Sequence, residues 1–418
     1  MKVKGILGAL AFAALALLPR AAAAQGDSSA RVVAPGVTLR RVVRPEGPWV
    51  IHALAVDLGN RELAVQAERA CDRLTGRERP SAISKRLNAS GMEVLAAINA
   101  GFFDLEGGSG ATVGNVVVEG EIAQASGATN GAAPRRRPVR SQLAIERDGR
   151  PVIARFTLSG TVRTPRGRWP IAALNEPPAA DAVTLYTDWS QRPPRVPATM
   201  RAVSVPLALE SRSGDTLRYR VVADGPDTAR ATSERGLLVG TGAAAAKVAA
   251  LRPADRVTAV ATLTPDGTPR ALVTGWPAIV RDGRSLMETL DSLEGASTAF
   301  ATTRHPRSAV GISRGGDTLL LVAVDGRQAA SVGMSLAELA RTMLGLGAWN
   351  ALNLDGGGST ALVVRDSVVN TPSDPTGERA VGDVLLVTRP AAARPTRSLP
   401  APANVPGCVL AGARDPDR

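Results

Sequence analysis

Short runs of apolar residues alternate with short polar segments along most of the chain. This pattern is typical of β-strands separated by turns. The segment WVIHALAVDL (49–58) predicts a long strand, and EVLAAINAGFFD (93–104) predicts a buried strand that runs into a turn. Glycine-containing turns flanked by alternating residues predict hairpins at 114–124, 142–155 and 275–284. The spacing at PSAISKRLNASG (80–91) instead predicts a helix that a glycine ends.

The segment from 319 to 355 has the strongest pattern. LLLVAVD (319–325) is a continuous apolar run, as expected for a strand covered on both faces. SLAELARTMLGLG (335–347) predicts a helix with a capping box made by Ser335 and Glu338, and WNALNLD (349–355) predicts the next strand. Strand, helix and strand at these lengths predict a βαβ unit with parallel strands. The predicted fold class is therefore α/β with α+β character: a mixed sheet with flanking helices and β-rich hairpin elaborations.

The chain of 418 residues divides into three expected parts. A basic start, an apolar stretch and small residues near Ala24 predict a signal peptide over 1–24. The main folded domain is expected over 30–389, with a proline-containing β-rich elaboration at about 156–274 that includes a short helix at GAAAAKVAAL (242–251). The Pro/Ala/Arg-rich tail, 390–418, is expected to be disordered.

These features indicate an exported protein, secreted or periplasmic. No later apolar run reaches the ~18–20 residues that span a bilayer. The two cysteines, Cys71 and Cys408, are the residues that could form one disulfide in an oxidising compartment; two unpaired thiols are the alternative.

A net charge of +12 raises the question of nucleic-acid binding. The excess is almost entirely arginine and accompanies heavy use of alanine and proline, which indicates a compositional bias of the whole chain. Aromatic residues make up only 3% of the chain and leave few surfaces on which bases could stack. We therefore expect no nucleic-acid partner, and an acidic or phosphate-bearing glycan fits export better.

Candidate chemistry gathers where predicted buried strands end. Asp325 and Asp355 each follow a strand and precede a glycine, so parallel pairing would place both carboxylates at one edge of the sheet. Asn99 and Asp104, at the end of AINAGFFD, could join that edge. One Asp-Gly pair at a strand end is usually only a turn, but three strands that end alike favour a site.

The glycine triplet Gly356, Gly357 and Gly358 can turn backbone amides toward a ligand and form an anion-accepting nest, to which Ser359 and Thr360 add hydroxyl donors. No lysine follows the triplet, and TALVVRDSVVN (360–370) reads as a hairpin, so a nucleotide-binding loop is disfavoured. A phosphoryl or polar sugar group is the expected ligand.

Histidine is limited to His52, within a predicted strand, and His305, in a loop before a strand. A site with several histidine ligands is therefore excluded. Two chemistries stay open for the aspartates. Asp325 and Asp355 could hold Ca²⁺ or Mg²⁺ with a carbonyl from Asn99, or they could flank a sugar and cleave a glycosidic bond.

These pieces together resemble the phosphodiester glycosidase family. The resemblance rests on AAINAGFFD, GWPAIVRDG, RHPRSAVGI, VAVDGRQAASVGMSLAELA, NLDGGGSTALVV and VVNTPSDPTGERAVGDVLLV, in this order between residues 37 and 387. It implies hydrolysis at the anomeric carbon of a sugar-1-phosphodiester. Asp325 and Asp355 are then the first catalytic candidates, followed by Asp104 and Glu378, with nucleophile and base unassigned. Substrate contacts would come from Asn99, His305, Arg307, Arg327, Arg379 and the residues from Gly356 to Thr360.

Two other functions compete with hydrolysis of sugar-phosphate diesters. One is a non-catalytic protein that binds envelope glycans or exopolysaccharides through the same edge. The other is a metal-dependent phosphoesterase that cleaves the P–O bond instead of the sugar C–O bond.

Overall fold

The computed structural model describes residues 28–105, 109–127, 140–190, 196–223, 232, 234–287, 294–389 and 407–410. The expected signal peptide and all of the expected tail except residues 407–410 lie outside these ranges. Within them, no helix has both the length and the apolar character needed to cross a membrane.

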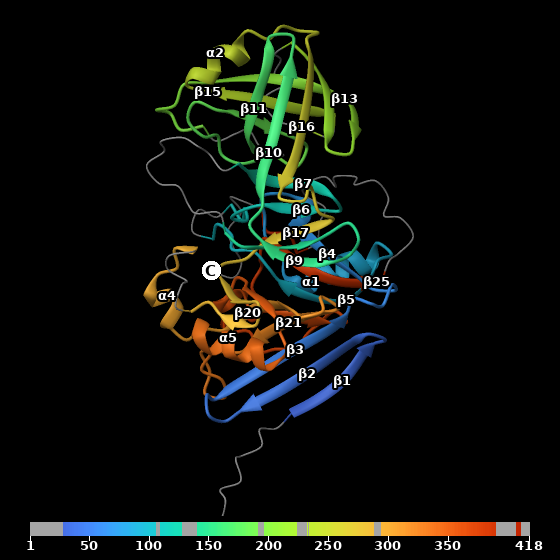
Figure 1. Ribbon diagram of the computed structural model, residues 1–418, viewed down its shortest axis with the longest axis vertical. Helices are drawn as coiled ribbons and strands as arrows, with labels where there is room; N and C mark the ends of the chain where they lie inside the picture. The colour runs from blue at the N-terminus through green and yellow to red at the C-terminus, as the bar shows by residue number, and fades with distance from the viewer. Residues whose placement is uncertain are drawn as a thin grey trace, which may run out of the picture.

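The body of the protein contains two β-sheets (Figure 1). The larger has the order β1 (Ser28–Ala34), β2 (Val37–Arg44), β3 (Trp49–Asp57), β21 (Thr318–Val324), β20 (Arg307–Ile312), β22 (Asn350–Asn353), β18 (Ala278–Arg281) and β19 (Arg284–Ser285). The smaller has the order β24 (Ser367–Val368), β23 (Leu362–Val364), β5 (Glu93–Asn99), β25 (Asp383–Arg389) and β4 (Ala64–Arg69).

The two sheets pack face to face, and a helix covers the outer face of each. One core cluster joins side chains from both sheets, including Leu54, Leu321 and Leu352 from the larger and Ile98 and Leu385 from the smaller. Helix α5 (Leu336–Gly345) covers the larger sheet, and α1 (Pro80–Ala89) covers the smaller one. Strands in the middle of each sheet are therefore buried on both faces, which explains their continuous apolar runs.

A second unit, drawn in green at the top of Figure 1, is a closed barrel of seven strands. Its order is β10 (Thr157–Thr164), β16 (Arg256–Thr264), β14 (Thr216–Val221), β13 (Ala202–Ser213), β15 (Arg235–Thr241), β12 (Val183–Tyr186) and β11 (Gly167–Leu174). A pairing between β10 and β11 closes the ring, and α2 (Ala243–Ala249) packs against β15. From β11 the sheet continues into the body through β7 (Glu121–Ser126), β6 (Val116–Val118), β17 (Ala271–Thr274), β8 (Gln142–Ile145) and β9 (Pro151–Ala154).

The predicted α/β fold class is wrong, because the protein is built mainly from antiparallel strands. The expected elements are present, including β3, β5, α1, α2, α5 with its capping box, and the hairpins β6–β7, β8–β9, β18–β19 and β23–β24. The βαβ unit fails in one respect: β20 lies between β21 and β22 and is antiparallel to both. The same double burial that suggested a parallel α/β sheet arises here from two packed sheets with a helix outside each.

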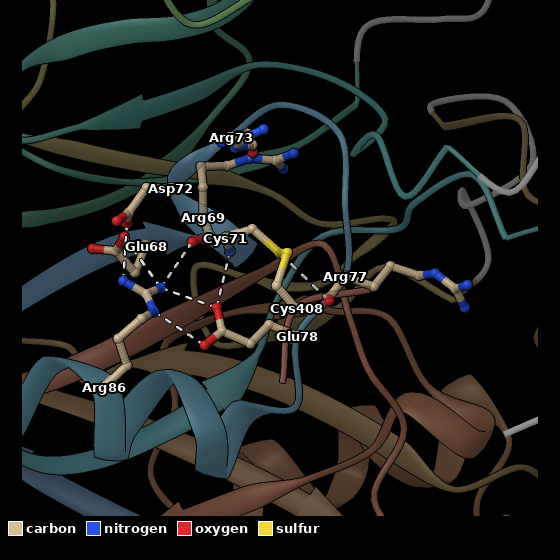
Figure 2. Close-up of a disulfide and its surroundings, with 9 residues drawn as sticks. All are labelled: Glu68, Arg69, Cys71, Asp72, Arg73, Arg77, Glu78, Arg86 and Cys408. Carbon is tan, nitrogen blue, oxygen red and sulfur yellow. Dashed lines mark hydrogen bonds and ion pairs between the residues drawn. A yellow bond between two sulfur atoms is a disulfide. The ribbon is translucent and has the colours of Figure 1, made fainter. Parts of the chain in front are cut away.

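The disulfide between Cys71 and Cys408 is formed, with a Cα–Cα distance of 5.6 Å. It attaches residues 407–410 to the turn that follows β4, and Val409 exchanges two backbone hydrogen bonds with Arg77. Figure 2 shows the charged cluster beneath it. The Arg86 guanidinium donates to the Glu78 carboxylate at 3.0 Å, and Glu78 also accepts from the Cys71 amide at 2.9 Å. Helix α1 and the disulfide turn are thus held to each other.

Candidate active site

The candidate site lies where β22 ends and the two sheets meet. Asp355 follows β22, and its amide donates to the Ala100 carbonyl at 2.9 Å, just beyond β5. The Asn99 side chain donates to the Asp355 carbonyl at 2.7 Å, and its oxygen accepts from Ser308 and from the Ala361 amide at 2.6 and 3.1 Å. Asn99 is fully buried and fixes the backbone on both sides of the glycine triplet, so it positions the site.

The glycine triplet forms a short 3₁₀ turn, Gly357–Ser359, and its neighbours explain the glycines. Gly357 has φ +64°, a left-handed conformation that other residues rarely adopt. A Cβ on Gly358 would collide with the side chains of Arg379 and Asp374, which lie directly on the backbone there. The triplet therefore lets charged side chains approach the main chain.

Most amides of this turn are already used within the protein. The amides of Gly356 and Gly357 donate to Asp355 Oδ1 and to the Pro306 carbonyl, at 3.0 and 2.9 Å. Those of Ser359 and Thr360 donate back into the turn at 3.2 Å each. These four amides are thus engaged within the protein. The buried Thr360 hydroxyl completes no hydrogen bond among the described residues and is a donor that a ligand could use.

The Asp355 carboxyl has an unusual acidity. Burial raises its pKa from 3.8 to about 6, and the nearby carboxylate of Asp383 pushes in the same direction. The Ser359 hydroxyl, the charge of Arg379 and the Gly356 amide oppose the shift without cancelling it. A carboxyl that exchanges its proton near neutral pH can act as a general acid or base.

Asp383 is the second carboxyl of this pair. It lies at the start of β25 and is 1% exposed, and burial raises its pKa. Its Oδ1 accepts from the Gly101 amide at 2.7 Å, while Oδ2 has no hydrogen-bond partner in the described structure and lies 4.0 Å from the Arg69 guanidinium. Two carboxyls with raised pKa values and an unpaired buried oxygen are typical of a reactive centre.

Two cationic groups approach the glycine turn from neighbouring loops. Arg379 is held by Asp374 through hydrogen bonds of 2.7 and 2.9 Å. Arg327, which has φ +60°, lies 3.4 Å from His305 Nδ1, and a Cβ on Gly357 would meet its guanidinium at 3.1 Å. Burial, Arg307 and Arg327 lower the pKa of His305, which favours its neutral form. An anionic group bound here would meet both arginines.

A comparison with known sequences finds a similar family over part of the chain. The sequence model of phosphodiester glycosidases matches residues 219–388, which include β20, β22, the glycine turn and Asp383. Residues 219–388 of the chain are thus similar to the phosphodiester glycosidase family.

Individual relatives match shorter stretches. The bovine N-acetylglucosamine-1-phosphodiester alpha-N-acetylglucosaminidase is 34% identical over 110 residues, 25% of this chain and 20% of that protein. The uncharacterized prophage-derived protein YomE of Bacillus subtilis is 40% identical over 92 residues, 22% of this chain and 14% of that protein. The matches thus span no more than about a fifth of these relatives.

A solved structure extends the likeness over most of the chain. A protein of Burkholderia pseudomallei described as exported has a TM-score of 0.63 and 27% identity, and the match covers 82% of this chain and 74% of that one. The two-sheet body and its added barrel are therefore an arrangement that another solved protein shares to a large extent.

Asp325, the other first candidate, occupies a buried position at the same edge of the larger sheet. It is 3% exposed; its Oδ1 accepts from the Thr371 amide at 2.9 Å, and Oδ2 lies 3.5 Å from His52 Nε2. Asp325 thereby attaches the 371–380 loop, which carries Arg379, to the sheet. No cluster of three or more His, Cys, Asp or Glu side chains suited to a metal occurs among the described residues. Both side-chain groups of Asn99 are engaged in hydrogen bonds within the protein.

The side chains of three further candidates make hydrogen bonds within the protein. Asp104 accepts from the Ser109 hydroxyl at 2.6 Å within its own loop. Glu378 accepts from the Ser81 amide and hydroxyl at 2.8 and 2.5 Å, and so caps the first turn of α1. The Arg307 guanidinium donates to the carbonyls of Met334, Phe300 and Thr303 at 2.8–3.1 Å, so its donors serve the backbone.

An aromatic cluster beside the site was not expected from the sequence. Trp276 stacks on Phe300 at 4.7 Å and meets the edge of Phe102 at 5.8 Å, and the Arg140 guanidinium lies over Trp276 at 4.9 Å. The Asn353 side chain of β22 donates to the Trp276 carbonyl at 2.6 Å, and the Trp276 amide donates to the Asn353 carbonyl at 2.8 Å. The three rings come from segments far apart in sequence, so no local pattern could have grouped them; all three are partly exposed.

Proposed function

We propose that the protein hydrolyses sugar-1-phosphodiesters at the sugar C–O bond. The observation that carries the proposal is the Asp355 carboxyl, with a pKa of about 6, on a glycine turn beside Asp383 and the cation of Arg379. The match to the phosphodiester glycosidase model supports the same chemistry, and so does the bovine relative, which is named an N-acetylglucosamine-1-phosphodiester alpha-N-acetylglucosaminidase.

In the proposed reaction, the bond from the anomeric carbon to the phosphate oxygen breaks, and the oxygen of a water molecule ends on that carbon. The products are the free sugar and a phosphomonoester. One carboxyl of the Asp355–Asp383 pair accepts the proton of the attacking water or attacks the carbon itself. Arg379 and Arg327 stabilise the charge on the leaving phosphate, which needs little protonation because it is already a good leaving group. The partly exposed rings of Trp276 and Phe300 form an apolar wall for the sugar.

We also propose export and an envelope or extracellular glycan as the setting. The signal-like residues 1–24 support this, and so does the formed disulfide, since disulfides persist mainly in oxidising compartments. The similar Burkholderia pseudomallei protein is described as exported.

The test is hydrolysis of methyl diesters of sugar 1-phosphates, including α-N-acetylglucosamine, by the wild type, Asp355→Asn and Asp383→Asn. Asp282→Asn, in the exposed β18–β19 turn, is the matched control. We expect reducing sugar from the wild type and the control, with at least ~100-fold less from the two site variants. In ¹⁸O water, the label should enter the sugar.

Two results would contradict the proposal. Label in the phosphate, together with loss of turnover on addition of a chelator, would indicate a metal-dependent phosphoesterase. Saturable glycan binding that persists in Asp355→Asn without any turnover in the wild type would indicate a glycan-binding protein.

A further inference from the structure

The outer surface of the barrel carries a group of arginines that the proposed reaction does not use. Side chains alternate along each strand, so Leu158 and Val162 of β10 fill the barrel while Arg163 faces outward. The same alternation exposes Arg168 on β11, Arg218 on β14 and Arg256 on β16. We call Arg163, Arg168, Arg218 and Arg256 the barrel arginine face.

The strand register brings these residues together. Arg163 lies directly opposite Arg168 on one side and opposite Thr258 on the other, and Thr258 in turn faces Arg218. Arg256 lies two residues before Thr258, on the same face of β16. Neighbouring strands are ~4.8 Å apart, so the row across four strands spans roughly 14 Å. This is wide enough to meet more than one phosphate group of a polymer.

Charge along this row is not balanced by the protein. Like charges directly opposite each other destabilise a sheet, so the pair Arg163–Arg168 costs stability as it stands. Ion pairs in the described part of the chain engage the adjacent Arg220, through Glu210, but none of the four residues of the barrel arginine face. Opposed, unneutralised arginines at ordered strand positions point to an anionic partner.

The positions of the aromatic residues in the barrel indicate which polyanion, a nucleic acid or a phosphate-bearing glycan, suits the arginine face. Trp169 and Tyr219 point into the barrel and are 7% and 2% exposed. The arginine face therefore offers charge and bidentate donors without rings on which bases could stack. This combination suits a chain of phosphodiesters read through its phosphates.

We propose that the barrel arginine face binds an anionic, phosphodiester-linked glycan polymer and so holds the enzyme on the polymer that it cleaves. The inference rests on the proposed function for the nature of that polymer. In the view of Figure 1, β10 and β16 connect the barrel to the body, so docking and cleavage belong to separate parts of one chain.

The test compares the triple variant Arg163→Gln, Arg168→Gln, Arg218→Gln with a control that loses the same charge elsewhere. The control changes the exposed Arg31, Arg40 and Arg61 of the body to Gln. Binding of poly(N-acetylglucosamine 1-phosphate) is measured at 50 and 150 mM salt, with a 30-nucleotide oligothymidine as the second probe. Hydrolysis of the methyl diester of N-acetylglucosamine 1-phosphate is measured in parallel.

We expect the barrel variant to bind the glycan polymer at least ~10-fold more weakly, with a shallower salt dependence, because each phosphate contact adds to that dependence. Its kcat/KM on the small diester should stay within about twofold of wild type, since the site is intact. The control should bind the polymer as the wild type does.

Equal loss of binding in the control would show that binding depends only on the net charge of the protein, and would overturn the inference. Unchanged binding in the barrel variant would also overturn it. Tighter binding of oligothymidine than of the glycan polymer would replace it with nucleic-acid binding. Failure of the proposed function would appear separately, as a wild type that does not cleave the small diester. Polymer binding would then still decide the role of the barrel.

Discussion

Asp355 should reduce the stability of the folded protein at the pH where it is ionised. Its pKa is raised from 3.8 to about 6 by burial, so the folded state binds the proton more tightly than the unfolded state. The contribution of such a carboxyl is fully favourable below pH ~3.8 and is lost as the pH rises through ~6. Asn cannot ionise. The change Asp355→Asn should therefore stabilise the protein progressively as the pH rises.

The magnitude follows from the shift. A rise from 3.8 to about 6 is roughly two pKa units, and each unit corresponds to 1.36 kcal/mol. Above pH ~7 the ionised carboxylate then costs about 3 kcal/mol that is absent at pH ~3.5. For a protein whose whole free energy of unfolding is of the order of 5–15 kcal/mol, this difference is large.

The assay is urea unfolding of the wild type, Asp355→Asn and the control Asp282→Asn at several pH values from 4 to 8. We expect the free energy of unfolding of Asp355→Asn, minus that of the wild type, to increase by about 2–3 kcal/mol across this range. The control should stay parallel to the wild type. A difference for Asp355→Asn that is constant with pH, or that falls as the pH rises, would refute the raised pKa and with it the acid–base role.

Three other predictions concern the same site. The variant Asp383→Asn should lower the pKa of Asp355, because it removes a neighbouring negative charge. The acidic limb of the pH profile of its residual kcat/KM should then lie at lower pH than in the wild type. An acidic limb at the same pH would show that the charge of Asp383 does not affect the pKa of Asp355. Gly358→Ala should abolish activity by displacing Arg379 and Asp374, whereas Gly345→Ala, where a Cβ meets nothing within 4 Å, should keep wild-type kcat; equal effects would contradict the packing argument. Because burial raises the pKa of Glu378, the stability of Glu378→Gln relative to the wild type should increase as the pH rises from 4 to 8, with kcat unchanged; a large loss of kcat would instead support Glu378 as a catalytic residue.

Local patterns predicted the elements of this fold but not how they pair. Helix α5 was predictable because a capping box and an apolar stripe are properties of ten consecutive residues. The pairing of β21 and β22 was not, since the strand between them, β20, precedes both in the chain. Nothing in residues 318–353 records that β20 pairs with both strands, and two sheets packed against each other leave the same apolar runs as a parallel sheet under helices.

The same holds for the candidate site: residues marked by a local sequence pattern could be predicted, whereas residues brought in by distant strands could not. Asp355 and the glycine turn could be found from the sequence because an aspartate before three glycines, at the end of an apolar strand, is a continuous signal. Asp383 could not, because it reads as an ordinary strand start; it becomes a candidate only when β25 pairs with β5 and places it against Gly101. The sequence also made Glu378 a candidate, and its carboxylate accepts a hydrogen bond from the Ser81 amide, a contact that no local pattern indicated. The type of residue therefore indicates which groups can react, but burial and the neighbours brought by distant strands decide which of them does.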